Sequence, residues 1–436
     1  MFCSILVLVK ETYLDQTILI IGAGAAGLMA GRELSANGYN IIILEAADHS
    51  GGRVSTLTNN FFTHPVEAGA EFVHGKLALT FQILREAGIP YLKTGGKMVS
   101  FTNGEWQRED LWTKGWQEMT NRLQDLVEDM TIAEFLKTYF AGPAFAELRQ
   151  TVQSFSEGYD GADITKASTF ALREELTEPG NGTYRIQGGY QQLIQYLEGI
   201  CKLQNCTIVN RCVVKKISWE KEKVKAISGD GRTFTGNKVI ITVPLGVLLA
   251  SPEDIASIIF QPSIEKYLQA ASRIGYGSVI KILLQFKNPF WQKRGKNIGF
   301  LFTGELIPTW WTQAPDNYPL LTGWVCGPKA WALMGQSDAD ILKIALDSLA
   351  AVFSLDFVGL QEILTAWHVG SWYKNPFARG GYSYCTLETV KAREILNTPL
   401  EKTLYFAGEA YYERGSSGTV EAALASGQST AQKIIG

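Results

Sequence analysis

The chain has 436 residues, of which 46% are hydrophobic and 19% are charged, and its net charge is −3 at neutral pH. This length exceeds the usual size of one hydrophobic core, so we expect two interlocked domains. The balanced charge argues against nucleic acid as the main partner. No segment approaches the roughly 20 consecutive apolar residues of a membrane-spanning helix. We therefore expect a soluble, cytoplasmic protein, either a monomer or a homodimer.

The six cysteines show no CxxC pair and no histidine at metal-ligand spacing. Neither a disulfide framework nor a metal site is therefore expected, and a reducing compartment is the simpler interpretation. The apolar segment Phe2–Val9 lacks the basic region and the cleavage site of a signal peptide. We interpret it as a leader or an extra strand.

The most informative segment opens with an apolar run, Ile18–Ile21, that leads into the glycine-rich sequence Gly22-Ala-Gly24-Ala-Ala-Gly27. A helix-forming stretch follows, and a second strand is predicted at Ile41–Leu44. This order is that of a dinucleotide-binding βαβ unit. Gly22 permits the tight turn, Gly24 lets the backbone approach a pyrophosphate, and Gly27 lets the helix pack close to the sheet. The helix N-terminus offers N–H groups and its dipole to the phosphates.

A glycine-rich turn that only packs is the alternative, but here the strands, the helix and an acidic residue fall in register. Glu45 ends the second strand and can accept hydrogen bonds from ribose hydroxyls. Arg53 follows on a turn made by Gly51 and Gly52, where an arginine can donate two hydrogen bonds to a diphosphate. This arrangement is typical of a flavin site more than of a nicotinamide site, so the expected cofactor is FAD.

Residues 76–150 are predicted to be largely amphipathic helices, among them Leu77–Ala87, ended by Gly88, and Trp116–Asp129. A further helix is predicted at Tyr190–Cys201. From Cys206 to Val243 the period changes to two, which predicts short strands joined by hairpins, with a turn at Gly229-Asp230-Gly231. The last of these strands, Val239–Val243, is expected in a buried parallel sheet. Later elements are strands at Ser278–Phe286 and Leu320–Val325 and a helix at Asp338–Phe353.

The C-terminal segment combines the same kinds of feature as the N-terminal unit: a strand at Leu404–Gly408, the acidic residue Glu409 and a helix from Thr419. The predicted fold is α/β, with a Rossmann-like FAD-binding domain on a parallel sheet and an inserted α+β substrate domain built on a mixed sheet. The predicted FAD-binding domain comprises residues 14–75, 182–262 and 370–436. The predicted substrate-binding domain comprises residues 76–181 and 263–369.

Seven motifs along nearly the whole chain occur in the order found in one family. They are GAGAAG, GGR, EAGAEFVHG (Glu67–Gly75), TVPLGVL (Thr242–Leu248), GSVIKILLQF (Gly277–Phe286), ARGGYSY (Ala378–Tyr384) and FAGE (Phe406–Glu409). On these motifs the chain resembles the flavin-dependent amine oxidases, which include monoamine oxidases, polyamine oxidases and related histone demethylases. The resemblance implies a flavin ring at the interface of the two domains.

The resemblance also implies which residues bind FAD: Gly22, Gly24, Ala25, Ala26, Gly27, Glu45, Ala46, Gly52, Arg53, Gly69, Ala70, Glu71, Phe72, Val213, Gly408, Glu409, Gly418, Thr419 and Val420. Among these, Glu409 would bond the ribityl–phosphate region, and the helix that starts at Gly418 would point its N–H groups at the flavin pyrimidine. A capped surface helix is the alternative. Gly381 stands where monoamine oxidases carry the cysteine that binds flavin, so binding is expected to be non-covalent. Ala47 replaces a common family arginine near the ribose.

Lys281 is a charged residue within an otherwise apolar predicted strand. A buried ammonium without a partner costs several kcal/mol or loses its proton, so the residue needs a specific partner, unless it lies at a strand edge and reaches solvent. The resemblance implies that Lys281 holds a water molecule near flavin N5. Its positive charge would help O2 to accept the first electron.

Tyr382 matches an aromatic residue that stands beside the flavin face and guides the amine, with a π-face that favours cationic or electron-rich groups. The second aromatic position of many amine oxidases corresponds here to Thr419, so the aromatic cage is half present, as in the histone-demethylase branch. Trp372 matches a tryptophan next to the flavin, with an ordinary core tryptophan as the alternative.

The substrate is indicated by fewer residues. Phe72 lies where amino-acid oxidases carry an arginine for the substrate carboxylate, which disfavours an amino acid. His74 resembles the histidine of polyamine oxidases at this place, or is a core histidine. Glu174, Glu175 and Glu178 could pair with distal ammonium groups or simply form a solvated loop. A polyamine is the leading substrate class.

The resemblance implies oxidation of an amine C–N bond to an imine by hydride transfer to flavin N5, followed by reoxidation of the flavin by O2 to give H2O2. A dry aromatic pocket would favour the uncharged amine that reacts. The alternatives are an FAD-dependent L-amino-acid oxidase, an FAD-dependent desaturase acting on an apolar substrate, and a non-catalytic binding protein of the demethylase branch. The identity of the amine and the choice between oxidase and dehydrogenase stay open.

Overall fold

The structure is a computed structural model that describes residues 16–58, 61–75, 77–108, 114–177, 182–295, 297–413 and 417–436. The apolar segment Phe2–Val9 and the candidate substrate residue Glu178 lie outside these ranges. Among the helices of the described ranges, none combines the length and the apolar character needed to cross a membrane.

A five-stranded sheet organises the half of the molecule that contains the chain's first motif. Its strands run in the order β10-β2-β1-β14-β23, and all four neighbouring pairs are parallel. The bounds are β1 Thr17–Ile21, β2 Asn40–Leu44, β10 Cys206–Val209, β14 Lys238–Ile241 and β23 Leu404–Phe406. Strand β14 lies between β1 and β23, which confirms the predicted parallel strand at Val239–Val243.

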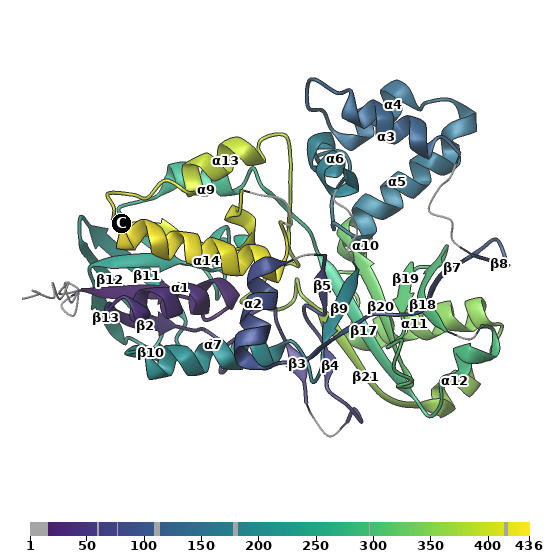
Figure 1. Ribbon diagram of the computed structural model, residues 1–436, viewed down its shortest axis with the longest axis horizontal. Helices are drawn as coiled ribbons and strands as arrows, with labels where there is room; N and C mark the ends of the chain where they lie inside the picture. Colours follow the sequence, from purple (N-terminus) through teal and green to yellow (C-terminus); the bar gives the residue numbers. More distant parts are fainter. Residues whose placement is uncertain are drawn as a thin grey trace, which may run out of the picture.

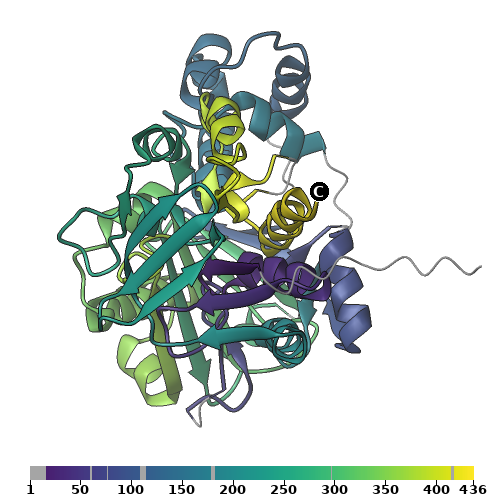
Figure 2. The same ribbon diagram turned by 90° about the vertical axis from the view of Figure 1, so that its left-hand side faces the viewer.

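Both faces of this sheet are covered, as a parallel sheet requires. Along β1, Ile18 and Ile20 pack against helices on one face, whereas Leu19 and Ile21 belong to a core on the other face. The helices of the first face are α1 Ala25–Ala36, α7 Gln191–Leu203 and α14 Val420–Ile435. The second face carries strands β11 Val214–Glu220, β12 Lys223–Ser228 and β13 Thr233–Gly236, with β15 Ile259–Gln261 and helices α8 Leu245–Leu248, α9 Glu265–Ala271 and α13 Thr389–Leu396. Figure 2 shows β11 and β12 on the side of the parallel strands opposite α14.

The strands predicted between Cys206 and Val243 divide between two sheets. Strand β11 pairs antiparallel with β12, and β12 pairs antiparallel with β13 through the predicted turn at Gly229-Asp230-Gly231. Strand β10 instead pairs in parallel with β2. The expected hairpin is therefore wrong for β10, because helix α7 returns the chain to the edge of the parallel sheet.

The other half of the molecule is built on a seven-stranded mixed sheet in the order β21-β17-β20-β19-β18-β7-β8 (Figure 1). Strand β17, Val279–Phe286, lies between β20 and β21 and is antiparallel to both; all eight of its residues are buried. The other bounds are β7 Lys97–Thr102, β8 Glu105–Arg108, β18 Ile298–Thr303, β19 Thr309–Trp311, β20 Leu320–Cys326 and β21 Leu364–Ser371. Helices α11 Asp338–Phe353 and α12 Phe357–Ile363 pack against its core. These bounds confirm the strands and the helix predicted here.

Residues 91–108 depart from the largely helical pattern predicted for residues 76–150. They form strand β6, Tyr91–Lys93, and the hairpin of β7 and β8. Asn103 and Gly104 both have positive φ at the hairpin turn, and an Asn-Gly pair is a strong hairpin signal. The local turn chemistry therefore outweighed the surrounding helical pattern.

Four helices form a separate lobe with its own core, seen beside the mixed sheet in Figure 1. Their bounds are α3 Trp116–Gln124, α4 Ile132–Tyr139, α5 Ala146–Gly158 and α6 Thr169–Thr177. Helix α3 ends before the predicted Asp129, because the Asp129 carboxylate instead accepts hydrogen bonds at the start of α6 from Ser168, Thr169 and the Phe170 N–H. Helix α2, Ala78–Ala87, ends at Gly88 as predicted.

A small sheet in the order β5-β9-β6 stands between the two halves (Figure 1). It pairs β5 Phe72–His74 with β9 Thr183–Ile186. The predicted α/β fold, with a parallel dinucleotide-type sheet and a second part built on a mixed sheet, is confirmed. The residue boundaries of the two domains stay a prediction.

Candidate active site

The turn between β1 and α1 has the geometry expected of a nucleotide-binding loop. Gly22 adopts φ +110°, which glycine favours. A Cβ on Gly27 would lie 2.0 Å from the Gly22 carbonyl oxygen, so only glycine lets α1 start this close to the sheet. At Gly24 a Cβ would have no neighbour nearer than 4.0 Å. Packing within the chain therefore does not require glycine at this position, and the open space beside Ala25 and Ala26 fits a group that approaches the backbone.

Glu45 is buried at the end of β2 and fixes this turn from the other side. Its carboxylate accepts hydrogen bonds from the Ala23 N–H at 2.6 Å and the Ala47 N–H at 2.8 Å. Burial raises its pKa, which these backbone donors partly offset. The Glu45 carbonyl accepts from the Cys212 N–H at 2.7 Å, which brings Val213 and Ala46 to the same end of the sheet. The predicted contact of Glu45 with a ribose stays a prediction.

Arg53 lies on the predicted Gly51-Gly52 turn and connects it to the C-terminal segment. One of its terminal nitrogens donates to the Glu409 carboxylate at 2.8 Å and to the Gly381 carbonyl at 2.7 Å. Glu409 is buried and also accepts a hydrogen bond from the Ser383 hydroxyl at 2.5 Å. Arg53, predicted at the diphosphate, and Glu409, predicted at the ribityl–phosphate region, thus form one ion pair.

Helix α14 begins beside Tyr382. Thr419 caps the helix by accepting a hydrogen bond from the Ala422 N–H, and Val420 is its first residue. Gly418 has φ +79°, and a Cβ there would lie 3.1 Å from the Tyr382 ring and 3.0 Å from the Ser383 carbonyl oxygen. The predicted C-terminal helix and the predicted active-site tyrosine are therefore direct neighbours. Behind them the Gly408 N–H donates to Ser426 in α14.

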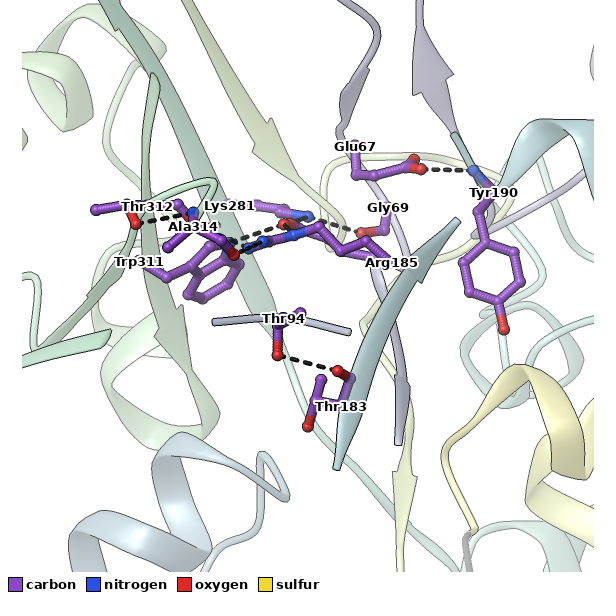
Figure 3. A network of polar contacts seen from close by, with 11 residues as sticks. Glu67, Gly69, Thr94, Thr183, Arg185, Tyr190, Lys281, Trp311, Thr312 and Ala314 are labelled. Carbon is purple, nitrogen blue, oxygen red and sulfur yellow. Dashed lines mark hydrogen bonds and ion pairs between the residues drawn. The ribbon is translucent and has the colours of Figure 1, made fainter. Parts of the chain in front are cut away.

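Lys281 has the specific partner that its position in β17 requires. Its side chain is 1% exposed, and Nζ lies 2.7 Å from Glu71 Oε2 and 3.0 Å from the Gly69 carbonyl oxygen. The Trp311 ring lies 5.5 Å from the same nitrogen. Figure 3 shows Lys281, Gly69 and Trp311 converging with Arg185. The alternative of a strand-edge lysine that reaches solvent is wrong, because β17 has a neighbour on each side.

Glu71 binds two cations at once. Besides Lys281 it accepts from Arg185 Nε at 2.8 Å and from Trp311 Nε1 at 3.0 Å. Burial alone would raise its pKa, but the charges of Lys281 and Arg185 outweigh burial and hold the pKa below its usual range. Glu71 is therefore ionised. Ala70 and Phe72, its neighbours, contact the Arg53 carbonyl and the Trp311 ring respectively.

Tyr382 and Trp372 lie on either side of the start of β17. The Tyr382 hydroxyl donates to the Tyr159 carbonyl oxygen at 2.5 Å and lies 3.4 Å from Cys326 Sγ. Burial raises its pKa well above the usual value, so the phenol stays neutral. The Trp372 indole donates to the Ala68 carbonyl at 3.0 Å, beside the Gly69 carbonyl that Lys281 binds. The structure thus brings Lys281, Trp372 and Tyr382 to one region, although their roles stay a prediction.

The predicted substrate residues lie in different environments. His74 packs between the rings of Phe72 and Tyr159, at 5.7 and 5.6 Å, and burial lowers its pKa to about 4, so it is neutral at physiological pH. Glu174 is exposed on α6. Glu175 forms a hydrogen bond with Asp160, whose pKa is raised well above its usual value by burial and by this second carboxylate.

Several residues in this region belong to no motif in the sequence. Trp324 stacks on Tyr382 with ring centroids 6.5 Å apart, and Trp311 lies 5.7 Å from Trp324. Arg185 and Asp160 contribute ionisable side chains from segments that contain no motif. Their only local signal is a charged residue within a short strand, for Arg185, and an acidic residue two positions after the end of a helix, for Asp160.

The described residues fit a flavin dinucleotide. The open glycine turn, the Arg53–Glu409 pair and the start of α14 follow one another toward Tyr382 and Lys281. The Tyr411 hydroxyl is buried near Arg53 and Glu409, and among the described residues it has no hydrogen-bond partner. A buried polar atom in this position is consistent with a ligand that supplies the missing partner.

The parallel sheet with its open glycine turn and the buried charges near it are the features expected of a flavin-dependent oxidoreductase. The sequence matches the family described as flavin containing amine oxidoreductase over residues 25–141 and 117–435. The chain therefore belongs to the flavin containing amine oxidoreductase family, which confirms the resemblance seen in the motifs and the expectation of a flavin-dependent enzyme.

Relatives with known names include demethylases and amine oxidases. Human lysine-specific histone demethylase 2 is 26% identical over 98% of this chain and 54% of that protein. Polyamine oxidase 2 of Arabidopsis thaliana is 27% identical over 91% of this chain and 83% of that protein. The chain spans about half the length of the mammalian demethylases that it matches.

Solved structures confirm the fold. Putrescine oxidase bound to putrescine superposes with a TM-score of 0.79 at 21% identity, over 96% of this chain and 99% of that one. Cyclohexylamine oxidase from Brevibacterium oxydans IH-35A gives a TM-score of 0.79 at 20% identity, over 96% and 98% of the two chains.

Proposed function

We propose that the protein is an FAD-dependent amine oxidase that converts a C–N bond of a polyamine-like amine to an imine. The observation that carries this proposal is the buried ammonium of Lys281, fixed by Glu71 in the same region as Tyr382 and Trp372. Burial of a charged group costs free energy unless the group is paired. The ion pair with Glu71 therefore allows Lys281 to keep its charge in this region. The names of the polyamine and putrescine oxidases among its relatives support the same substrate class.

FAD would supply the hydride acceptor and would pass the electrons on to O2 to give H2O2. Its diphosphate would bind at the open turn of Gly22, Gly24 and Gly27 and at the N-terminus of α1. Glu45 and Arg53 would hold the ribose and phosphate regions, and the start of α14 would face the pyrimidine. Because glycine occupies position 381, the binding would be non-covalent.

The amine would bind against aromatic rings. Tyr382 and Trp324 stack, and Trp311 and Phe72 extend the aromatic surface toward Lys281. A neutral amine is the reactive form, and apolar walls favour it over the ammonium. His74, neutral at physiological pH, adds no competing positive charge.

Anaerobic bleaching of the flavin absorbance by a panel of amines tests this proposal, followed by readmission of air with detection of H2O2. The panel contains spermine, spermidine, acetylated polyamines, aromatic monoamines and L-amino acids. Rapid bleaching by polyamines is expected. Bleaching by amino acids alone would show that Phe72 does not exclude a carboxylate and would favour the L-amino-acid oxidase. A flavin that no amine bleaches would contradict an amine oxidase and favour a desaturase or a non-catalytic protein.

Replacement of the lysine separates the two halves of the reaction. In Lys281→Met, reoxidation of the reduced flavin by O2 is expected to slow about 100-fold, the cost of removing one oriented charge from an active site. Bleaching by amine is expected to change far less. The control is Lys343→Met, which removes an exposed lysine paired with Asp347 on α11. Unchanged reoxidation in Lys281→Met would remove the lysine from the oxidative step.

A further inference from the structure

A carboxylate held between two cations lies at the centre of the site. We propose that Glu71 and Arg185 are positioning residues that set the charge at Lys281, so that the unit acts as a buried triad with a net charge of +1. The inference rests on the proposed function, because it gives that charge a role in the reaction with O2. We refer to Lys281, Glu71 and Arg185 as the charge triad.

The geometry of the charge triad is tightly fixed. The Lys281 and Glu71 side chains are 1% and 5% exposed, and that of Arg185 is 16% exposed. Arg185 donates to Glu71 through Nε, and through its two terminal nitrogens to the carbonyls of Thr312 at 2.9 Å and Ala314 at 3.2 Å. Its guanidinium also lies 4.8 Å from the centre of the Phe72 ring. Figure 3 shows this fork of Arg185 directed at the segment after β19.

Three separate parts of the chain meet here, since Glu71 precedes β5, Arg185 is on β9 and Lys281 is on β17. A lysine paired with one carboxylate is neutral overall. Arg185 restores one positive charge and keeps Glu71 ionised. O2 becomes an anion when it accepts its first electron, and a positive charge in a poorly solvated site stabilises that anion much more than in water.

Other titratable groups face this region from the neighbouring strands. Glu67, on β4 Val66–Glu67, interacts with Lys281 and has its pKa raised to about 7, chiefly by burial. His368, on β21, lies opposite Leu283, and burial lowers its pKa, so it stays neutral. Trp311 and Thr312, from β19 and the residue after it, carry no charge. The charge of Glu71 also raises the Glu67 pKa, so Glu67 should titrate at lower pH in Glu71→Gln than in the wild type.

The test measures the rate at which photoreduced flavin is reoxidised by O2, as a function of pH. In Glu71→Gln the two buried cations lose the anion between them. Because both cannot easily stay charged without it, the rate should decline about tenfold or more as the pH rises. In Arg185→Gln the pair remains but the net charge is zero, so the rate should fall about tenfold at every pH without a new step. Arg185→Lys restores the charge without the fork and should recover much of the rate.

The flavin reduction potential gives a readout that does not depend on turnover. Loss of a positive charge should lower it in Arg185→Gln at all pH values, whereas in Glu71→Gln it should start above the wild-type value at low pH and fall as pH rises. The matched control is Arg32→Gln, which removes another Arg–Glu pair, also at 2.8 Å, between Arg32 on α1 and Glu86 on α2. It should leave the profile and the potential unchanged.

The proposal would be overturned if Glu71→Gln and both Arg185 variants had the same pH profile of reoxidation and the same flavin reduction potential as the wild type. If Glu71→Gln does not fold, the contrast between Arg185→Gln and Arg185→Lys still decides it, and equal rates in these two variants would overturn it. Photoreduction requires no amine. A failure of the amine panel would therefore contradict the proposed substrate without affecting the test of the charge triad.

Discussion

Glu67 is a single residue whose environment makes a pH-dependent contribution to stability. Its carboxyl group accepts hydrogen bonds from the Tyr190 N–H at 2.6 Å and the Thr56 hydroxyl at 2.8 Å. Burial nevertheless raises its pKa to about 7. The folded protein thus favours the protonated form, and this contribution is complete below the ordinary glutamate pKa and is lost as the pH rises through about 7.

We predict that Glu67→Gln gains stability relative to the wild type as the pH rises. Glutamine can accept the same backbone hydrogen bond but does not ionise. The difference in free energy of unfolding between the two proteins should grow by about 2–3 kcal/mol between about pH 5 and pH 8, the energy equivalent of the raised pKa. Urea unfolding of both proteins at these two pH values measures it.

The control for this prediction is Glu198→Gln, which alters a partly exposed glutamate paired with Lys202 on α7. Its effect on the free energy of unfolding should be the same at both pH values. An equal effect of Glu67→Gln at both pH values would show that Glu67 does not titrate in this range.

At the residue scale the sequence predicted that Lys281 has a partner but not which residue it is. Lys281 in an apolar strand predicted a specific partner, because burial of an unpaired ammonium is costly. Neither Glu71 nor Arg185 could be assigned as that partner, since the contact depends on how the mixed sheet meets the small sheet of β5 and β9. Long-range contacts of this kind leave no local pattern.

At the element scale, two glycines of the β1–α1 turn have different roles: packing requires glycine at position 27, whereas position 24 has room for a ligand. Gly27→Ala should destabilise the protein by about 1–3 kcal/mol or more, because its Cβ would overlap the Gly22 carbonyl. Gly24→Ala should stay within about 0.5 kcal/mol of the wild type, because the nearest atom to its Cβ, the Gly51 carbonyl oxygen, is 4.0 Å away. Under the proposed function, however, Gly24→Ala should weaken FAD binding at least about tenfold, a loss of about 1.4 kcal/mol.

Thermal unfolding and a flavin titration of the two variants check this prediction. Gly199→Ala, in the middle of α7, has open space around its Cβ and should stabilise the protein by about 0.5–1 kcal/mol without affecting flavin binding. Normal FAD affinity in a folded Gly24→Ala protein would place the diphosphate elsewhere.

Elements with strong local signals were predictable, and elements that depend on distant neighbours were not. The first βαβ unit and helix α11 follow from periodicity and turn residues, and the structure confirms them. The partner of β10 could not be read from its short apolar run, because the same four residues suit a hairpin or a parallel edge. The hairpin at Asn103-Gly104 does carry a local turn signal, but the helical pattern on either side of it predicts a helix.

At the scale of the whole molecule, the proposed FAD site draws on segments that are far apart in the sequence. Arg53 pairs with Glu409, and Lys281 pairs with Glu71 next to the Gly69 carbonyl. A cofactor that contacts all of these segments would bind the folded chain and not the unfolded one. Binding would therefore add directly to the free energy of unfolding.

We predict that removal of the flavin lowers the thermal unfolding midpoint and that FAD restores it. At a concentration about 100 times its Kd, FAD should raise the free energy of unfolding by about 2.7 kcal/mol. Riboflavin at the same concentration should restore little, because it lacks the diphosphate for which the open turn at Gly24 and the N-terminus of α1 are suited. Thermal unfolding of the apoprotein with each compound measures this, and equal stabilisation by riboflavin would contradict a dinucleotide site at the β1–α1 turn.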